Sequence, residues 1–152
     1  MTFEELISGF GRKIGVELTA EDETCVIKVD DMVVTIMSLP TCGRLAVHAE
    51  IGEPPPHGLE RLLSSMLESN HLFVGTAGAT ISRDPETGRF HLCRQESLDV
   101  LDVDALAVLV ESFVNTLEIW RTAIANYRPP EEDDAPRSAE PESDFSVDAL
   151  RV

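Results

Sequence analysis

Basic residues are scarce in this chain of 152 residues, in which 12 lysines and arginines stand against 28 aspartates and glutamates, a formal net charge of -16. Nucleic acids and anionic membrane surfaces attract proteins through clustered positive charge, so this balance argues against both as partners. The sequence also lacks a long uninterrupted apolar run, and no membrane-spanning helix is expected. We therefore expect a soluble protein.

Cysteines are few as well. Cys25, Cys42 and Cys93 are odd in number, far apart and outside any CxxC spacing, which argues against a disulfide framework or a zinc site. We interpret them as small residues in the strands of a reduced protein. The N-terminus, Met1 to Glu5, lacks the positive region and apolar stretch of a signal peptide, so we expect a cytoplasmic location.

Patterns that carry catalysis are missing too. The four histidines share no metal-ligand spacing, and no P-loop, nucleophile elbow or dinucleotide fingerprint is present. The Gly75–Gly78 stretch lacks the lysine and hydroxyl residue of a phosphate-binding loop, and the acidic clusters fall in caps, loops and turns where carboxylates are solvated. The sequence therefore predicts no enzyme, no bound metal and no cofactor. The histidines are His48, His57, His71 and His91.

The first half of the chain predicts a helix followed by three strands. Thr2 and Glu5 form a capping box, after which apolar residues recur at helical spacing to Ile14, with Gly9 and Gly11 as unfavourable interruptions. Three β-rich runs follow, separated by turn residues, and they predict an antiparallel meander. The expected strands are Thr24–Val29, Met32–Leu39 and Arg44–Ile51.

The second half predicts a helix, a hairpin and a long helix. Leucines and Met66 follow the loop at Pro54–Pro56 and indicate a helix that ends near Asn70. Residues 79–83 and 89–94 flank a Pro- and Gly-containing turn, and Asp102 or Asp104 can cap a helix that ends before Pro129. The order α-β-β-β-α-β-β-α indicates an α+β fold, with helices packed on a twisted antiparallel sheet.

Composition changes abruptly at Pro129. The last 24 positions hold eight acidic residues, two arginines and four prolines. We therefore expect one domain over residues 1–128 and a flexible acidic, proline-rich tail over residues 129–152.

A resemblance adds to this interpretation. Residues 68–82 (ESNHLFVGTAGATIS) and 84–92 (DPETGRFHL), followed by an acidic linker and a helix with Phe113, Glu118 and Trp120, resemble the small acidic type III secretion chaperones of the Tir-chaperone class. The order of the eight elements agrees with that family over residues 2–128. The extension after Tyr127 is not required by the family pattern.

The resemblance implies a homodimer that binds the extended N-terminal segment of a secreted effector and keeps it secretion-competent, without a nucleotide. It also implies that the second helix and its neighbouring residues form the dimer interface, although the helix residues could equally belong to the core of one subunit. The expected dimer residues are Leu59, Leu62, Leu63, Met66, Leu72 and Phe73.

The first helix offers candidate effector contacts, namely Phe3, Leu6, Ile7 and Phe10, with packing in the core as the alternative. Two interpretations of the tail also stay open: a solvated tail, or docking of Phe145–Leu150 on an apolar patch in competition with the effector. The alternative function is a regulatory or adaptor module that binds a folded protein and has no link to secretion. An enzyme whose site has no sequence pattern is the third possibility.

Overall fold

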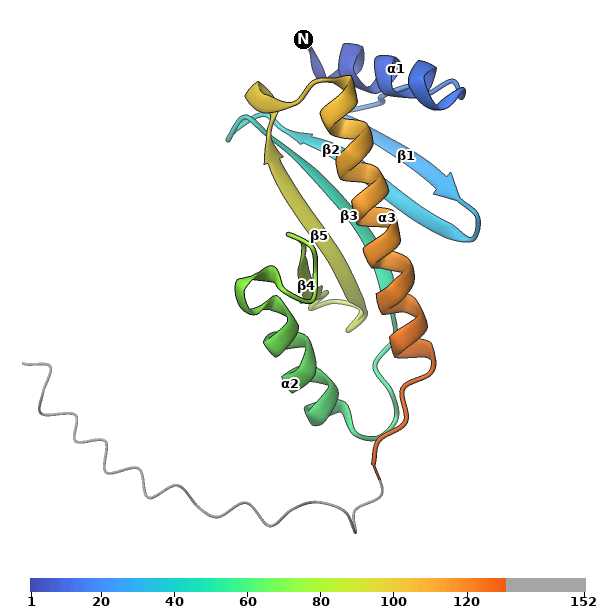
Figure 1. The fold of residues 1–152 in the computed structure, drawn as a ribbon, viewed down its shortest axis with the longest axis vertical. Helices are drawn as coiled ribbons and strands as arrows, with labels where there is room; N and C mark the ends of the chain where they lie inside the picture. The colour runs from blue at the N-terminus through green and yellow to red at the C-terminus, as the bar shows by residue number, and fades with distance from the viewer. Residues whose placement is uncertain (131–152) are drawn as a thin grey trace, which may run out of the picture.

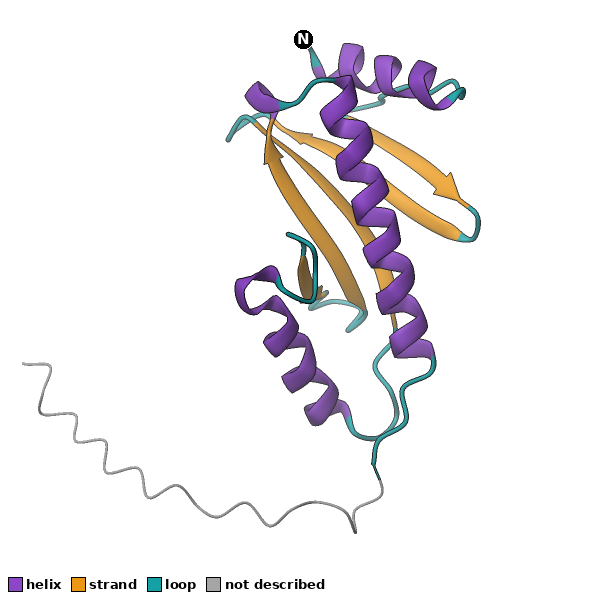
Figure 2. Cartoon of the chain, viewed as in Figure 1, coloured by secondary structure: helices purple, strands orange, loops and turns teal. Residues whose placement is uncertain are grey.

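The computed structural model describes residues 1–130, and the predicted docking segment Phe145–Leu150 lies outside that range, as does the tail from residue 131. The α-helices and strands follow one another in the order that the sequence predicts, and two short 3-10 segments that were not predicted lie between them (Figures 1 and 2). They are α1 (Phe3–Ile14), β1 (Thr24–Val29), β2 (Met32–Leu39), β3 (Arg44–Gly52), α2 (Leu59–Asn70), η1 (His71–Phe73), β4 (Thr80–Arg83), β5 (Phe90–Ser97), η2 (Leu98–Val100) and α3 (Val103–Ala125).

The capping box at the start of α1 is confirmed. The Thr2 hydroxyl accepts from the Glu5 amide at 3.2 Å, and the Glu5 carboxylate accepts from the Thr2 amide at 2.8 Å. Packing explains why a glycine stands at position 9 inside the helix. A Cβ added to Gly9 would lie 2.6 Å from Cγ2 of Val103. The glycine therefore allows α1 to approach the first turn of α3 closely.

The sheet has five antiparallel strands in the order β1-β2-β3-β5-β4. Thus β5, the later strand of the second hairpin, is the one that pairs with β3, and α2 lies between these two strands in sequence. The turn of this hairpin is held by Asp84, whose carboxylate accepts from the Glu86 amide at 2.9 Å and from the Thr87 hydroxyl at 2.7 Å. The hairpin prediction is confirmed, with β5 ending at Ser97, three residues later than expected.

The core lies between one face of the sheet and the helices α1 and α3. In Figure 1, α3 crosses over β3 while α1 lies across the upper end of the sheet and α2 lies beside β4. Asp102 caps α3, because its carboxylate accepts from the Ala105 amide at 2.8 Å. The buried stripe of α3 contains Leu106, Leu109, Val110, Phe113, Leu117 and Ile124.

The three cysteines are free, but they do not all lie in strands. Cys25 is buried in β1 and Cys93 is half-buried in β5, whereas Cys42 is exposed in the turn between β2 and β3. The expectation was therefore wrong for Cys42, because this residue belongs to the turn that reverses the chain. Within residues 1–130, no helix has the length and apolar character needed to cross a bilayer.

Shortening a side chain in the buried stripe of α3 is expected to destabilise the whole domain. Leu117 is fully buried, and the substitution Leu117→Ala should lower the free energy of unfolding by about 2–5 kcal/mol because it leaves a cavity. Ile119 is 66% exposed on the same helix, so Ile119→Ala should change it by no more than about 0.5 kcal/mol. Urea unfolding of both variants tests this, and equal losses would contradict the packing described for α3.

Candidate functional site

The four candidate effector contacts on α1 all lie in the core. Phe3, Leu6, Ile7 and Phe10 expose 6%, 2%, 0% and 3% of their surface. In the chain alone their role is to pack α1 against the sheet and α3. Contact between these residues and an effector stays a prediction.

The candidate dimer residues fall into three groups. Leu62 and Met66 are buried within the chain, at 5% and 3% exposure, and Leu59 and Leu63 are half-buried against the core. Leu72 and Phe73 project into solvent, at 76% and 53% exposure. Two further apolar residues of this region are exposed: Leu67, which belongs to the apolar pattern of the second helix, and Val74, which sequence reasoning did not single out. We call the four exposed residues Leu67, Leu72, Phe73 and Val74 the α2-end surface.

The backbone beneath the α2-end surface is strained. Leu72 and Phe73 have φ values of 52° and 58°, a region that bulky residues rarely adopt. Hydrogen bonds made by neighbouring residues hold the backbone in this conformation. Trp120 of α3 donates its indole N–H to the carbonyl of Gly75 at 3.0 Å, and Asn70 pairs with the Ile81 amide and carbonyl at 2.9 and 3.1 Å.

A narrow apolar groove lies beside this surface, between α2 and β4. Its volume is about 210 Å³, and Leu63, Met66, Leu67, Ile81 and Phe90 contribute the apolar lining. Leu67 belongs both to the groove and to the α2-end surface, so the groove and that surface meet at this side chain. An exposed apolar surface of this kind on a single chain is typical of a protein contact surface.

A larger groove, of about 590 Å³, lies on the other side of the core between β5 and the first half of α3. We call it the β5–α3 groove. Val100 and Val108 line it and are 70% and 67% exposed, while Arg94 and Glu96 extend from β5. It combines exposed apolar side chains with a few polar groups, as protein-binding grooves do.

Residues 5–121 of the chain match the sequence profile of the Tir chaperone protein (CesT) family. The chain belongs to this family. The match includes both grooves and the α2-end surface, and leaves out only the first four residues and the region after Arg121. Among curated protein sequences, no relative matches the chain.

Solved structures share the fold of this Tir chaperone family member. The HopA1–SchA chaperone–effector complex has a TM-score of 0.67 at 20% identity, covering 80% of this chain and 94% of that one. The Yersinia pestis type III secretion chaperone SycH, in complex with a fragment of YscM2, has a TM-score of 0.63 at 19% identity, covering 78% of this chain and 99% of that one. YbjN from E. coli has a TM-score of 0.60 at 12% identity, covering 80% of this chain and 90% of that one. At these identities the likeness shows a shared fold.

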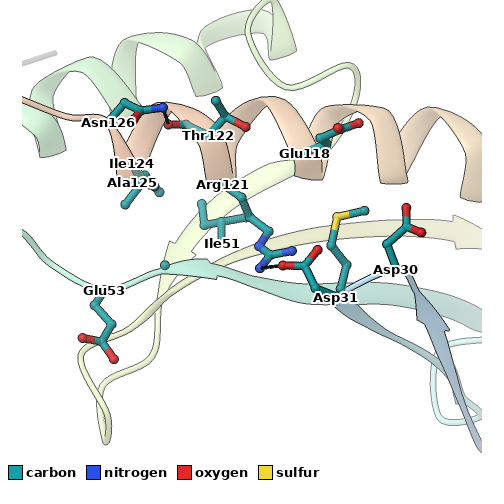
Figure 3. A pocket seen from close by; sticks show the side chains of 12 residues that line it. Asp30, Asp31, Ile51, Glu53, Glu118, Arg121, Thr122, Ile124, Ala125 and Asn126 are labelled. Atoms are coloured by element: carbon teal, nitrogen blue, oxygen red, sulfur yellow. Dashed lines mark hydrogen bonds and ion pairs between the residues drawn. The ribbon is translucent and has the colours of Figure 1, made fainter.

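Another cleft lies between the second half of α3 and the β1–β2 turn. Its volume is about 600 Å³, and its acidic side chains are Asp30, Asp31, Glu53 and Glu118 (Figure 3). Figure 3 shows Glu53, Glu118 and Asp30 pointing in different directions, while Arg121 reaches Asp31 across the cleft. A pair of carboxylates for acid–base catalysis needs to converge on one point, and these do not.

The outer face of the sheet holds the histidine pair His48 and His91, with ring centroids 6.3 Å apart. Burial, and then the neighbouring His91, lower the pKa of His48. In the part of the chain that the structure describes, no group of three or more His, Cys, Asp or Glu residues has the arrangement of a metal site.

The ion pair that closes the acidic cleft gives a pH prediction. Arg121 donates to Asp31 at 2.8 Å, and this hydrogen bond and charge lower the pKa of Asp31. The pKa of Asp31 is therefore lower in the folded than in the unfolded protein. The ion pair stabilises the fold fully at pH values above the unfolded-state pKa, and this stabilisation is lost as the pH falls through the folded-state pKa. The substitution Arg121→Gln should therefore raise the pKa of Asp31.

Carboxyl NMR titration of both proteins measures this change, and Asp84 serves as an internal control. The pKa of Asp84 is lowered by its hydrogen bonds to Thr87 and Glu86, so it should not respond to Arg121→Gln. An Asp31 pKa that is the same in both proteins would show that the ion pair does not form in solution.

Proposed function

We propose that this chain is a type III secretion chaperone that binds the N-terminal segment of a secreted effector in the cytoplasm and keeps it soluble and secretion-competent. The family match over residues 5–121 carries the proposal. The shared fold with solved chaperone–effector complexes supports it. The protein would act by binding alone, without catalysis, metal or nucleotide.

Sheet edges and apolar grooves suit an extended client. In the described chain, β1 has no strand beyond it, and β5 is twice as long as the β4 strand that borders it. An extended segment gains main-chain hydrogen bonds by pairing with such an edge, and its alternate side chains enter the adjacent grooves. The net charge of -16 would keep the complex soluble while the client stays unfolded.

The α2-end surface supports a homodimer. Four exposed apolar residues next to an apolar groove form an area that a second copy of the same surface could cover around a two-fold axis. Covering it would also offset the strain at Leu72 and Phe73, since positive φ at each such residue costs about 1–3 kcal/mol. A stable interface of this kind buries about 800 Å² on each subunit.

Binding to an unfolded client separates this function from an adaptor that binds folded proteins. We define the client segment as the N-terminal segment of the secreted protein that co-purifies with the chain from its native cells. The chaperone should bind the client segment with equal affinity whether the segment is refolded or freshly diluted from urea, because it recognises an extended chain. Calorimetry measures both affinities.

Binding that appears only after the client has folded would support the adaptor interpretation instead. Absence of any secreted protein among the co-purified partners would contradict the proposed function. A client that is retained in the cytoplasm when the chain is deleted, yet remains folded and soluble there, would contradict the chaperone role in the same way.

The dimer prediction is best tested at Leu72. Leu62 and Met66 are buried in the chain itself, so acidic replacements there would also damage the monomer. Leu72 is 76% exposed and has positive φ, a conformation that aspartate adopts more readily than leucine. The substitution Leu72→Asp should therefore preserve the fold and convert the dimer to a monomer at about micromolar concentration, because an unpaired buried carboxylate costs several kcal/mol.

Light scattering gives the mass of the variant and of a control, Ile119→Asp, in which the replaced residue is 66% exposed on α3. The control should stay dimeric. A wild-type monomer, or a Leu72→Asp protein that is still a dimer, would show that the α2-end surface is not the interface.

A further inference from the structure

The described part of the chain ends beside the start of α2. Tyr127 donates its hydroxyl to the carbonyl of Gly58, the N-cap of α2, at 2.9 Å. Pro129 lies against the same glycine, because a Cβ added to Gly58 would lie 2.6 Å from Cβ of Pro129. In Figure 1, the chain after α3 returns to the end of the domain where α2 begins. Residues 131–152 therefore continue from the same end of the domain.

The groove between α2 and β4, which we call the α2–β4 groove, differs in charge from the other two described above. Its lining contains no carboxylate, and its one charged side chain is Arg83. In the β5–α3 groove two carboxylates accompany one arginine, and in the cleft beside the β1–β2 turn four carboxylates accompany one arginine. Because like charges repel, an acidic segment fits the α2–β4 groove better than either of the others.

Arg83 has donors available for a carboxylate. It is exposed at the end of β4, and its Nε donates to the carbonyl of Gly88 at 3.1 Å. Among residues 1–130, no ion pair includes Arg83. A guanidinium binds a carboxylate through parallel hydrogen bonds of fixed geometry. At an exposed site such a pair adds little affinity, so its main effect is to orient a segment that apolar contact holds.

The sequence beyond the described residues supplies a segment of matching character. Residues 131–144 contain no large apolar side chain, whereas Phe145, Val147 and Leu150 follow within six positions. Asp144 and Asp148 stand on either side of the phenylalanine in the sequence. An aromatic side chain with acidic neighbours matches an apolar groove with an arginine at its margin.

The length of the chain lets this segment reach the groove. Fifteen residues lead from Pro130 to Phe145, and a flexible linker of that length spans about 20 Å on average. Leu67 lines the groove nine residues after Gly58, which is about 14 Å along the helix axis. A tether that matches the distance to its site holds a segment at about millimolar effective concentration, so even weak contacts keep the site occupied.

We propose that the segment Phe145–Leu150 docks in the α2–β4 groove of its own chain, with Phe145 between α2 and β4 and a neighbouring aspartate on Arg83. The groove, of about 210 Å³, is smaller than the pockets of about 300–1,000 Å³ that enclose whole ligands, and so it suits one anchoring side chain. Because the groove meets the α2-end surface at Leu67, the docked segment covers part of what a second copy would contact. The segment thereby weakens the homodimer, a consequence that rests on the proposed function.

Methionine-methyl NMR of the full chain tests the docking. Met66 lines the α2–β4 groove, whereas Met32 lines the acidic cleft and serves as an internal reference. The substitution Phe145→Ser should shift the Met66 resonance, because the aromatic ring leaves the groove, and should leave Met32 unchanged. Ala139→Ser, in the same tail but outside the docking segment, should shift neither. A Met66 difference that persists on dilution supports docking within one chain, and a difference that is absent or disappears on dilution overturns it.

A charge exchange tests the contact with Arg83. Arg83→Glu should move the Met66 resonance towards its undocked position, and Asp144→Lys with Asp148→Lys in the same chain should move it back. Recovery by the exchange separates lost docking from a local effect of Arg83→Glu. Arg44→Glu is the control, because Arg44 is exposed at the start of β3 and lies outside the groove lining. No recovery in the exchanged protein would show that the aspartates do not bind Arg83.

Sedimentation equilibrium tests the effect on the dimer. If about half of the chains hold the segment, about a quarter of the pairs have both surfaces free, so Phe145→Ser should tighten dimerisation about 4-fold. Ala139→Ser should leave it unchanged. Equal dissociation constants for the wild type and Phe145→Ser would overturn the effect on the dimer. Failure of the client segment to bind the wild-type chain would instead overturn the proposed function and leave the docking intact.

Discussion

Helix α3 packs its buried stripe across β3, and the β5–α3 groove and the acidic cleft both lie beside that contact. The stripe is narrow and straight while the sheet is five strands wide, so α3 can cover only the middle of one face. Its first half leaves the end of β5 open on one side, and its second half leaves the acidic cleft on the other. The grooves are therefore consequences of how one helix fits on one sheet.

The same helix also supports the α2-end surface from a distance. Trp120 reaches the carbonyl of Gly75, just after the two residues with positive φ, and Arg94 at the far side of the loop holds Ala77. These tethers connect the exposed Leu72 and Phe73 to the rigid core. A surface that is apolar, strained and tied down in this way is suited to contact with another protein, because the chain alone gains nothing from displaying it.

Local signals in the sequence predicted the elements well. The capping box at Thr2 and Glu5, the turn at Asp84–Gly88 and the cap at Asp102 each depend on residues close in sequence, and each is present. The pairing of β5 with β3 could not be predicted in this way, because it joins segments about 40 residues apart across α2. The resemblance to secretion chaperones supplied the function, and the family match supports the same conclusion.

The candidate site was harder to predict than the fold. Helical spacing identified Phe3, Leu6, Ile7 and Phe10 as one face of α1 but not how completely α3 and the sheet cover it. Val74 was missed because exposure depends on where the chain turns after α2, and Leu72 and Phe73 adopt a backbone that their residue types do not suggest.

The central claim is that this Tir chaperone family member holds its client as an extended chain. Hydrogen exchange of the client segment, free and in the complex, tests it most directly. We expect the free segment to exchange at the rate of an unfolded chain, and binding to protect only short stretches separated by unprotected ones. If protection covers the whole segment in one cooperative unit, and persists after the chaperone is removed, the client is not held as an extended chain.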